Sequence, residues 1–103
     1  DNVLEVRNKL PDAKIVVAEA GWPSVSSEFG DIASESNQDR YCEELMTWCK
    51  EMNITIFCFE AFDEDWKGNP NDMMGAEKHW GLYNVDRTPK LVMRQFQEQN
   101  IVK

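Results

Sequence analysis

The chain has no long apolar run and few basic residues. No stretch of its 103 residues approaches the roughly 20 consecutive apolar residues of a transmembrane helix, so we expect no membrane partner. The N-terminus, Asp-Asn-Val-Leu-Glu, lacks the basic-then-apolar pattern of a signal peptide. Eleven basic against nineteen acidic residues give a net charge of -8. Because phosphate neutralisation requires clustered Lys and Arg, we expect no nucleic-acid partner, and a neutral carbohydrate fits better.

Histidine and cysteine are scarce as well. His79 is the single histidine of the sequence, and one histidine with scattered acids makes no recognisable transition-metal site, so we predict no metal and no cofactor. The three cysteines of the sequence cannot all pair with one another. Cys42 and Cys49 would lie about 10 Å apart along a helix axis, which is too far for a disulfide. We therefore expect buried thiols.

The patterning predicts helix, strand, helix, strand, long loop and helix along the chain. Residues 3–10 form a short amphipathic segment. Residues 14–19 and 54–59 are expected strands, and both are mostly apolar, as is typical of a parallel sheet that is covered on both faces. A strand–helix–strand unit of this length implies parallel pairing. Residues 63–87 lack periodicity, and because a loop of this length is usually disordered or functional, its many acids and aromatics favour function.

Two further helices are expected. Ser34 or Ser36 can cap a helix that runs to about Met52. Its core-facing stripe consists of Tyr41, Leu45, Trp48, Cys49 and Met52. The final helix is expected to start at Thr88-Pro89, with Thr88 as its cap and Pro89 in its first turn. Its inward-facing residues are Leu91, Val92 and Phe96.

The most informative segment is residues 16–24, Val-Val-Ala-Glu-Ala-Gly-Trp-Pro-Ser. Glu19 lies at the end of an expected apolar strand, where an acid is energetically unfavourable unless it has a function. Gly21 permits a backbone conformation closed to other residues, and Pro23 stops the strand. Trp22 offers a flat apolar surface on which a sugar ring can stack. The alternative is that Glu19 caps or salt-bridges the strand end while Trp22 fills the core.

Three blocks of sequence occur in the order found in one known family. Residues 17–24, Val-x-Glu-x-Gly-Trp-Pro-Ser, resemble the nucleophile segment of glycoside hydrolase family 17, the β-1,3-glucanases and their transglycosylating relatives. Residues 59–67, Phe-Glu-Ala-Phe-Asp-Glu-Asp-Trp-Lys, resemble the last-strand motif of that family. Residues 77–84, Glu-Lys-His-Trp-Gly-Leu-Tyr-Asn, resemble the segment after it. The resemblance covers residues 14–90, and the sequences of these blocks are most similar to those of microbial members.

The resemblance implies an α/β fold that is the C-terminal part of a (β/α)8 TIM barrel, with strands seven and eight and their flanking helices in residues 1–103. A complete barrel usually needs ~250 residues, so we expect a fragment of the catalytic domain. The family's general acid/base would lie on an earlier strand. A cysteine bonded to the rest of the barrel is an alternative to the buried thiols. Association with the remainder of the barrel, or of the chain with itself, is expected.

The resemblance makes Glu19 the catalytic nucleophile. Retaining cleavage also needs a second carboxyl about 5 Å away that holds a proton. Glu64 and Lys67 match positions near the catalytic centre, where Lys67 favours ionised carboxylates and Glu64 holds Lys67 and binds sugar hydroxyls. The alternative is a solvated Glu64–Lys67 pair that contributes almost nothing. Glu77 matches a further acid of the same cluster, with a rim salt bridge as its alternative.

Aromatic side chains and one more acid are candidates for substrate binding. Trp22, Trp66 and Trp80 resemble subsite walls, because indole rings stack on pyranose faces. For Trp66 and Trp80, packing is an equal alternative. Glu60 is expected to hydrogen-bond inside the barrel or near substrate, and not to supply the proton, because the family's proton donor belongs to an earlier strand.

The resemblance therefore implies part of a retaining glycosidase similar to the glucan endo-1,3-β-glucosidases, with β-1,3-glucan or an oligosaccharide as substrate. A β-1,3-glucanosyltransferase shares the same glycosyl-enzyme intermediate and is an alternative. Another is a non-catalytic glucan-binding fragment that works through Trp22 and Trp80. A third is a small self-standing α/β protein with Glu19 and Glu60 as a carboxylate pair. By resemblance, the location is extracellular or in the cell wall.

Overall fold

The computed structural model describes residues 2–101, with side chains described for residues 2–97. The elements are α1 (Asn2–Lys9), β1 (Val16–Ala20), η1 (Gly30–Ile32), α2 (Glu35–Met52), β2 (Thr55–Cys58), η2 (Ala76–Lys78) and α3 (Leu91–Ile101), where η1 and η2 are single 3-10 turns. The predicted order of helices, strands and long loop is confirmed. In that part of the chain, no helix is both long and apolar enough to cross a membrane.

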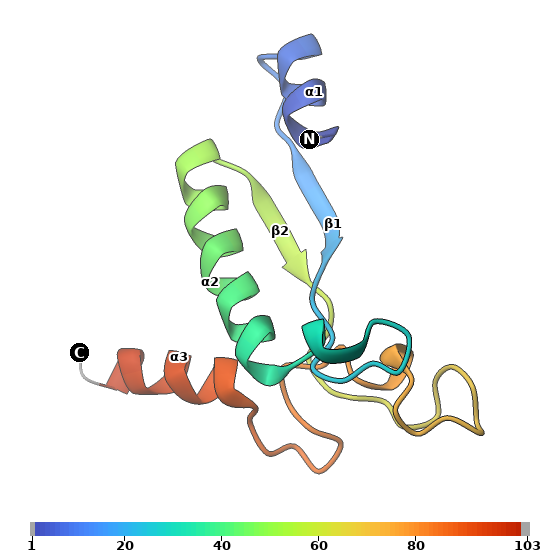
Figure 1. Cartoon of the computed structure of the whole chain (residues 1–103). Coiled ribbons are helices and arrows are strands. Elements are labelled where there is room, and N and C mark those ends of the chain that lie inside the picture. Colours follow the sequence, from blue (N-terminus) through green and yellow to red (C-terminus); the bar gives the residue numbers. More distant parts are fainter. Residues whose placement is uncertain (1, 102–103) are drawn as a thin grey trace.

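Strands β1 and β2 pair in parallel, as the sequence predicted. Val16 lies opposite Thr55 and Ala20 opposite Cys58, with an irregularity in β1 between Val17 and Ala20. Helix α2 makes the crossover and runs alongside β2 (Figure 1). Both strands point toward the loops that precede α2 and α3 (Figure 1). The carboxyl ends of β1 and β2 therefore meet at the same edge, which is where parallel sheets usually place a ligand.

Helix α2 is stabilised at both ends by local signals. Ser34 is the N-cap, and its Oγ accepts a hydrogen bond of 3.0 Å from the Asn37 amide. Asn53 ends the helix in the left-handed region at φ 55°, with its amide bonded to the Cys49 carbonyl. The predicted stripe is buried at Cys49 and half-buried at its other four positions.

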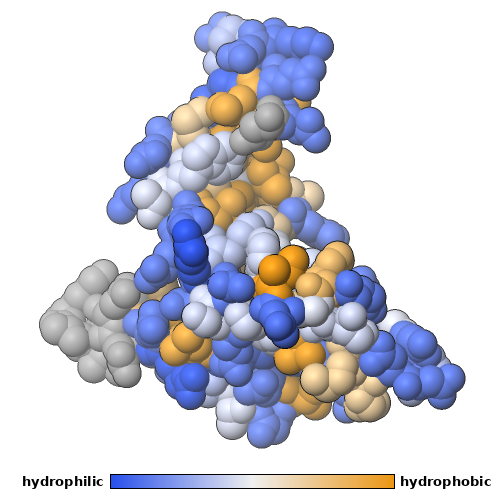
Figure 2. Space-filling model, in the orientation of Figure 1, coloured by the Kyte–Doolittle hydropathy of each residue, from blue (hydrophilic) through white to orange (hydrophobic). Residues whose placement is uncertain are grey.

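The prediction of a sheet covered on both faces is not met within the described residues. Val16 is 48% exposed and Phe57 is 61% exposed. Figure 2 shows apolar surface along the strands between α1 and the loops. The radius of gyration is 15.4 Å, against about 13 Å for a compact domain of this length. The apolar strand residues have a sequence typical of a buried sheet, but too few elements surround them here.

Helix α3 begins later than predicted. Its first residue is Leu91, and Thr88 does not cap it, because the Thr88 hydroxyl and amide both donate to Asp86 Oδ1. The Leu91 amide instead donates to Glu35 Oε1 at 2.8 Å. A carboxylate from the first turn of α2 thus satisfies the start of α3. Of the predicted inward-facing residues, Val92 is buried and Leu91 is half-buried, whereas Phe96 lines a hollow shared with α2 but is 49% exposed.

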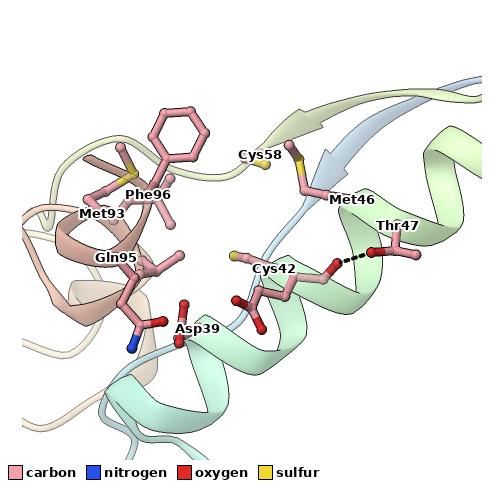
Figure 3. Close-up of a pocket in the computed structure, with 11 residues that line it drawn as sticks. Asp39, Cys42, Met46, Thr47, Cys58, Met93, Gln95 and Phe96 are labelled. Carbon is pink, nitrogen blue, oxygen red and sulfur yellow. Dashed lines mark hydrogen bonds between the residues drawn. The ribbon is translucent and has the colours of Figure 1, made fainter. Parts of the chain in front are cut away.

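A hollow of about 520 Å³ lies between α2 and α3 and reaches the end of β2 (Figure 3). Cys42 and Cys58 face it together with Met46, Met93 and Phe96. All three cysteines are free, as expected, but Cys49 alone is buried, while Cys42 is half-buried and Cys58 is exposed, which corrects the prediction of buried thiols. Burial raises the pKa of the Cys42 thiol to about 11, so this cysteine stays protonated.

Candidate active site

Glu19 lies at the carboxyl end of β1, one residue before the strand ends. Its side chain is exposed beside a hollow of about 430 Å³, here called the Glu19 hollow. The lining residues are Glu19, Ala20, Gly21, Tyr41, Phe59, Glu77 and Trp80. Within residues 2–97, no hydrogen bond or ion pair reaches the Glu19 carboxylate. The strand-end cap or salt bridge considered as an alternative is therefore not formed among these residues.

Gly21 is required by a close approach of two backbones. A Cβ at this position would lie 2.0 Å from the Phe59 carbonyl oxygen and 3.3 Å from the Trp80 ring. The φ of Gly21 lies outside the left-handed region, so the expected special backbone conformation was the wrong reason for this glycine. The Phe59 amide donates to the Ala20 carbonyl at 2.8 Å. The ends of β1 and β2 are thereby held against each other.

Trp22 has a fixed orientation beside a second hollow of about 260 Å³, here called the Trp22 hollow. Its indole Nε1 donates to the Ile32 carbonyl at 2.8 Å, and its ring lies 5.3 Å from the Tyr41 ring. The lining residues are Gly21, Trp22, Pro23, Phe29, Ile32, Ala33 and Trp80. Since Gly21 and Trp80 line both hollows, the two are neighbours. An acid next to an apolar surface of this kind suits a sugar, which has hydroxyl edges and apolar faces.

Glu60, Glu64 and Lys67 form one cluster just beyond β2. Lys67 Nζ lies 3.2 Å from Glu60 Oε2 and also pairs with Glu64 Oε2. The three side chains are 13%, 30% and 22% exposed, in that order. Lys67 Nζ also lies 4.8 Å from the centroid of the Phe59 ring, within cation–π range. Lys67 therefore contacts two acids and an aromatic ring, which differs from the isolated, solvated Glu64–Lys67 pair considered as an alternative.

The two acids of this cluster ionise differently. Burial is the main cause that raises the pKa of Glu60 to about 7, a hydrogen bond with Glu64 adds to it, and Lys67 opposes it. The pKa of Glu64 is lowered, first by the hydrogen bond with Glu60 and then by Lys67. Hydrogen bonding to Glu64 is the first cause that raises the pKa of Lys67. When environments separate the pKa values of two neighbouring acids, one can hold a proton while the other stays ionised.

The remaining predicted residues lie around the same edge. Glu77 is exposed on the Glu19 hollow, and it has no ion-pair partner within residues 2–97. Trp80 is half-buried, with its ring 6.4 Å from the Phe59 ring. Trp66 is 73% exposed and therefore does not pack in the core of this chain. Glu19, Glu77 and Trp80 thus share one hollow, whereas the Glu60–Glu64–Lys67 cluster lies beside it across Phe59.

Sequence reasoning missed a buried ion pair beneath these loops. Lys90 Nζ donates to Asp63 Oδ1 at 2.7 Å and to Ser24 Oγ at 2.8 Å. Asp63 Oδ1 also accepts the Gly81 amide, and His79 Nδ1 lies 3.3 Å from Asp63 Oδ2. The pair joins the loop after β1, the loop after β2 and the start of α3. An acid and a lysine far apart in sequence gave no local signal for this contact.

Gln38 is a second missed residue, and for it a signal existed. It is 1% exposed, and its Nε2 donates to the Trp22 carbonyl at 3.0 Å and to the Gly81 carbonyl at 2.9 Å. Gln38 precedes Tyr41 and Leu45 by three and seven residues, so it lies on the core-facing stripe of α2. A polar residue on such a stripe indicates a buried hydrogen bond.

The described residues offer no site for a metal ion. Among them, no group of three or more His, Cys, Asp or Glu side chains comes together in a way that could hold one. What the edge does offer is an unpaired carboxylate, two aromatic surfaces and a lysine held between two acids. This combination suits chemistry on an uncharged, hydroxyl-rich ligand.

Comparison with known proteins agrees with this chemistry. Residues 1–81 match the family described as the BtgE/BtgC glycoside hydrolase domain. The glucan 1,3-beta-glucosidase of Candida albicans is 32% identical over 97 residues, covering 87% of this chain and 32% of that protein. An endo-laminarinase from Formosa Hel1_33_131 has a TM-score of 0.78 at 30% identity, covering 98% of this chain and 27% of its own. A family 17 β-1,3-glucanosyltransferase from Rhizomucor miehei has a TM-score of 0.69 at 28% identity, covering 89% and 34%.

The chain spans about a third of the length of these relatives. Its solved neighbours of family 17 have the TIM barrel fold, and the parallel strand pair with its helices agrees with a segment of such a barrel. The family match covers most of the chain. The chain belongs to the BtgE/BtgC glycoside hydrolase domain family, within glycoside hydrolase family 17.

Proposed function

We propose that this chain is part of an enzyme that cleaves β-1,3-glucan with retention, and that Glu19 is its nucleophile. The observation that carries the proposal is the position of Glu19, unpaired within residues 2–97 at the end of a strand, in one hollow with Trp80 and Glu77. A strand end holds an attacking carboxylate rigidly, which near-attack geometry requires. An unpaired carboxylate has free lone pairs with which to attack the anomeric carbon.

The other residues of the edge have supporting roles in this proposal. Lys67 favours the ionised form of neighbouring carboxylates, Glu64 holds Lys67 and binds sugar hydroxyls, and Glu60 and Glu77 contribute further hydrogen bonds. Trp22 and Trp80 form walls against which pyranose rings stack. The proton for the leaving oxygen comes from a carboxyl on another strand of the intact barrel, about 5 Å from Glu19, as retention demands.

The chain fits this proposal as strands seven and eight of a TIM barrel, with β1 and β2 in these positions. The substrate follows from relatives whose names specify glucan 1,3-beta-glucosidase and laminarinase activity. Transfer to a second sugar is a related outcome, because it shares the intermediate on Glu19 and one relative is a glucanosyltransferase. We place the enzyme outside the cell or in the cell wall, where β-1,3-glucan is found.

The test is Glu19→Gln in the full-length protein that contains this chain, with laminarin-type glucan as substrate. We expect kcat to fall by at least about a thousandfold, because a nucleophile acts in bond making. Binding of laminari-oligosaccharides should change by less than about threefold, since an amide keeps the shape of the carboxylate. Glu51→Gln, an exposed acid in the last turn of α2, is the matched control. Full turnover by Glu19→Gln would contradict the proposal.

A further inference from the structure

Glu60 lies on a rigid stretch of backbone two residues beyond β2. Its amide donates to the Trp80 carbonyl at 3.0 Å, and its carbonyl accepts the Leu82 amide at 2.9 Å. A strand-like pairing therefore holds the residue on both sides.

The Glu60 carboxyl is only half satisfied where it lies. Oε2 receives the Lys67 ammonium at 3.2 Å, whereas Oε1 is buried and receives no hydrogen bond from an N–H or O–H donor of the described residues. Only 13% of the side chain is exposed. An ionised carboxylate with one buried oxygen unpaired is costly, while a neutral carboxyl can use that oxygen as a donor.

Lys67 cannot neutralise two acids at once. Its ammonium also pairs with Glu64, whose side chain is 30% exposed and so better hydrated than that of Glu60. Of two carboxyls that share one cation, the better hydrated one keeps the negative charge, and the more buried one holds the proton. The cluster is then one anion, one cation and one neutral acid, with no net charge.

The other charged groups near Glu60 favour the same proton position. Glu60 lines a hollow of about 350 Å³, and Asp63, Asp65 and Arg87 line it as well. Asp63 is already paired with Lys90, and the Arg87 guanidinium lies over the Phe62 ring at 4.0 Å. On the side of β1, the acids Glu19 and Glu77 line the hollow that Phe59 also lines. A charged Glu60 would add to a surplus of acids.

We propose that Glu60 is a positioning residue that works as a neutral carboxylic acid, donating its proton to Glu64 and accepting a hydrogen bond from Lys67. Loss of this proton removes the hydrogen bond to Glu64 and leaves two anions competing for one ammonium. Lys67 then shifts away from the geometry that serves the neighbouring nucleophile. The effect on rate rests on the proposed function, whereas the protonation is a property of the chain.

The first test measures the proton directly. The full-length protein is labelled with ¹³C at the Glu carboxyl carbons, and its NMR spectrum is followed from about pH 4 to pH 9. We expect one Glu carboxyl to titrate near neutrality and to be absent from Glu60→Gln. The control Glu51→Gln, at an exposed acid near the end of α2, should keep the signal that titrates near neutrality. A Glu60 signal that titrates below about pH 5.5 would overturn the proposal.

The second test measures the consequence for catalysis. The Glu60→Gln amide can still donate to Glu64 but cannot ionise, so the fall in rate that begins near neutrality should move to higher pH by at least about one unit. Glu60→Ala removes the donor, and its rate at acidic pH should be about tenfold lower than that of Glu60→Gln. Equal rates in the two variants, or an unmoved basic limb, would overturn the positioning role. A neutral Glu60 signal in a protein that cleaves no glucan would support the protonation and contradict the proposed function.

Discussion

Lys90 and Asp63, 27 residues apart, form an ion pair of 2.7 Å inside the protein, with 1% and 5% of their side chains exposed. The contact joins the base of α3 to the residue that follows Phe62 in the long loop. Ser24, the last residue of the nucleophile segment, accepts a second hydrogen bond from the same ammonium. The two loops that carry the candidate site are thus fixed to one buried charge.

Removing one partner of this pair should be costly. Lys90→Met leaves an uncompensated buried carboxylate, and we expect the full-length protein to lose about 3–5 kcal/mol of unfolding free energy. Urea denaturation measures this loss. Lys50→Met, at the exposed end of α2, should cost less than about 0.5 kcal/mol. The double variant Asp63→Asn/Lys90→Met should cost less than the sum of the single ones, and strict additivity would show that the pair is not coupled.

Replacing Gly21 should disturb the junction of β1 and β2. Gly21→Ala places a methyl group 2.0 Å from the Phe59 carbonyl, so the backbone must shift, and we expect a loss above about 3 kcal/mol. Gly30→Ala is the matched control, because Gly30 has open space around it and only its φ of 66° opposes the change. That strain costs about 1 kcal/mol. Equal midpoints of thermal unfolding for the two variants would contradict the close approach.

Lys67→Met should change the acidic limb of the pH–rate profile. Lys67 favours the ionised form of the carboxylates around it, as it does for Glu64, whose pKa it helps to lower. Without the cation these carboxylates take up protons at higher pH, so the limb should move up by roughly one unit. Lys67→Arg keeps the charge and should leave the limb in place. If Lys67→Met raises KM and leaves the limb unmoved, Lys67 is only a contact for the substrate.

The chain of residues 1–103 by itself should be inactive and should associate. One nucleophile without its proton donor cannot protonate a leaving oxygen. The strands β1 and β2 pair only with each other among the described residues, and large apolar side chains such as Phe57 are exposed. Light scattering should give a mass above that of a monomer, and laminarin-type glucan should release no sugar above a Glu19→Gln control. A compact, stable monomer would contradict the comparison of this chain with a barrel segment.

Local patterns were enough to predict most of the regular elements. The cap at Ser34, the stripe of α2 and the two apolar runs each depend on residues close in sequence. The start of α3 was mispredicted because its cap, Glu35, comes from another helix. The local sequence at Thr88-Pro89 cannot indicate that the Glu35 carboxylate lies next to the start of α3 in the folded chain.

In the candidate site, too, local sequence located some residues, whereas other contacts depend on the fold. Glu19 could be located at a strand end because strand, acid and strand breaker are adjacent in sequence. The pairing of Lys67 with both Glu60 and Glu64, and the burial of the Glu60 side chain, arise only when the loop folds. The Asp63–Lys90 pair and the exposed faces of β1 and β2 depend on which elements come together, and composition does not determine that.

The most direct test of Glu19 as nucleophile is covalent labelling of the full-length protein with a mechanism-based fluorosugar, followed by peptide mass mapping. A retaining enzyme forms a glycosyl-enzyme bond on its nucleophile, and a fluorosugar makes this bond long-lived. The label is expected on the peptide that contains Glu19, and Glu19→Gln should abolish it. A label on Glu60 or Glu64, or a Glu19→Gln protein that is still labelled, would contradict the assignment.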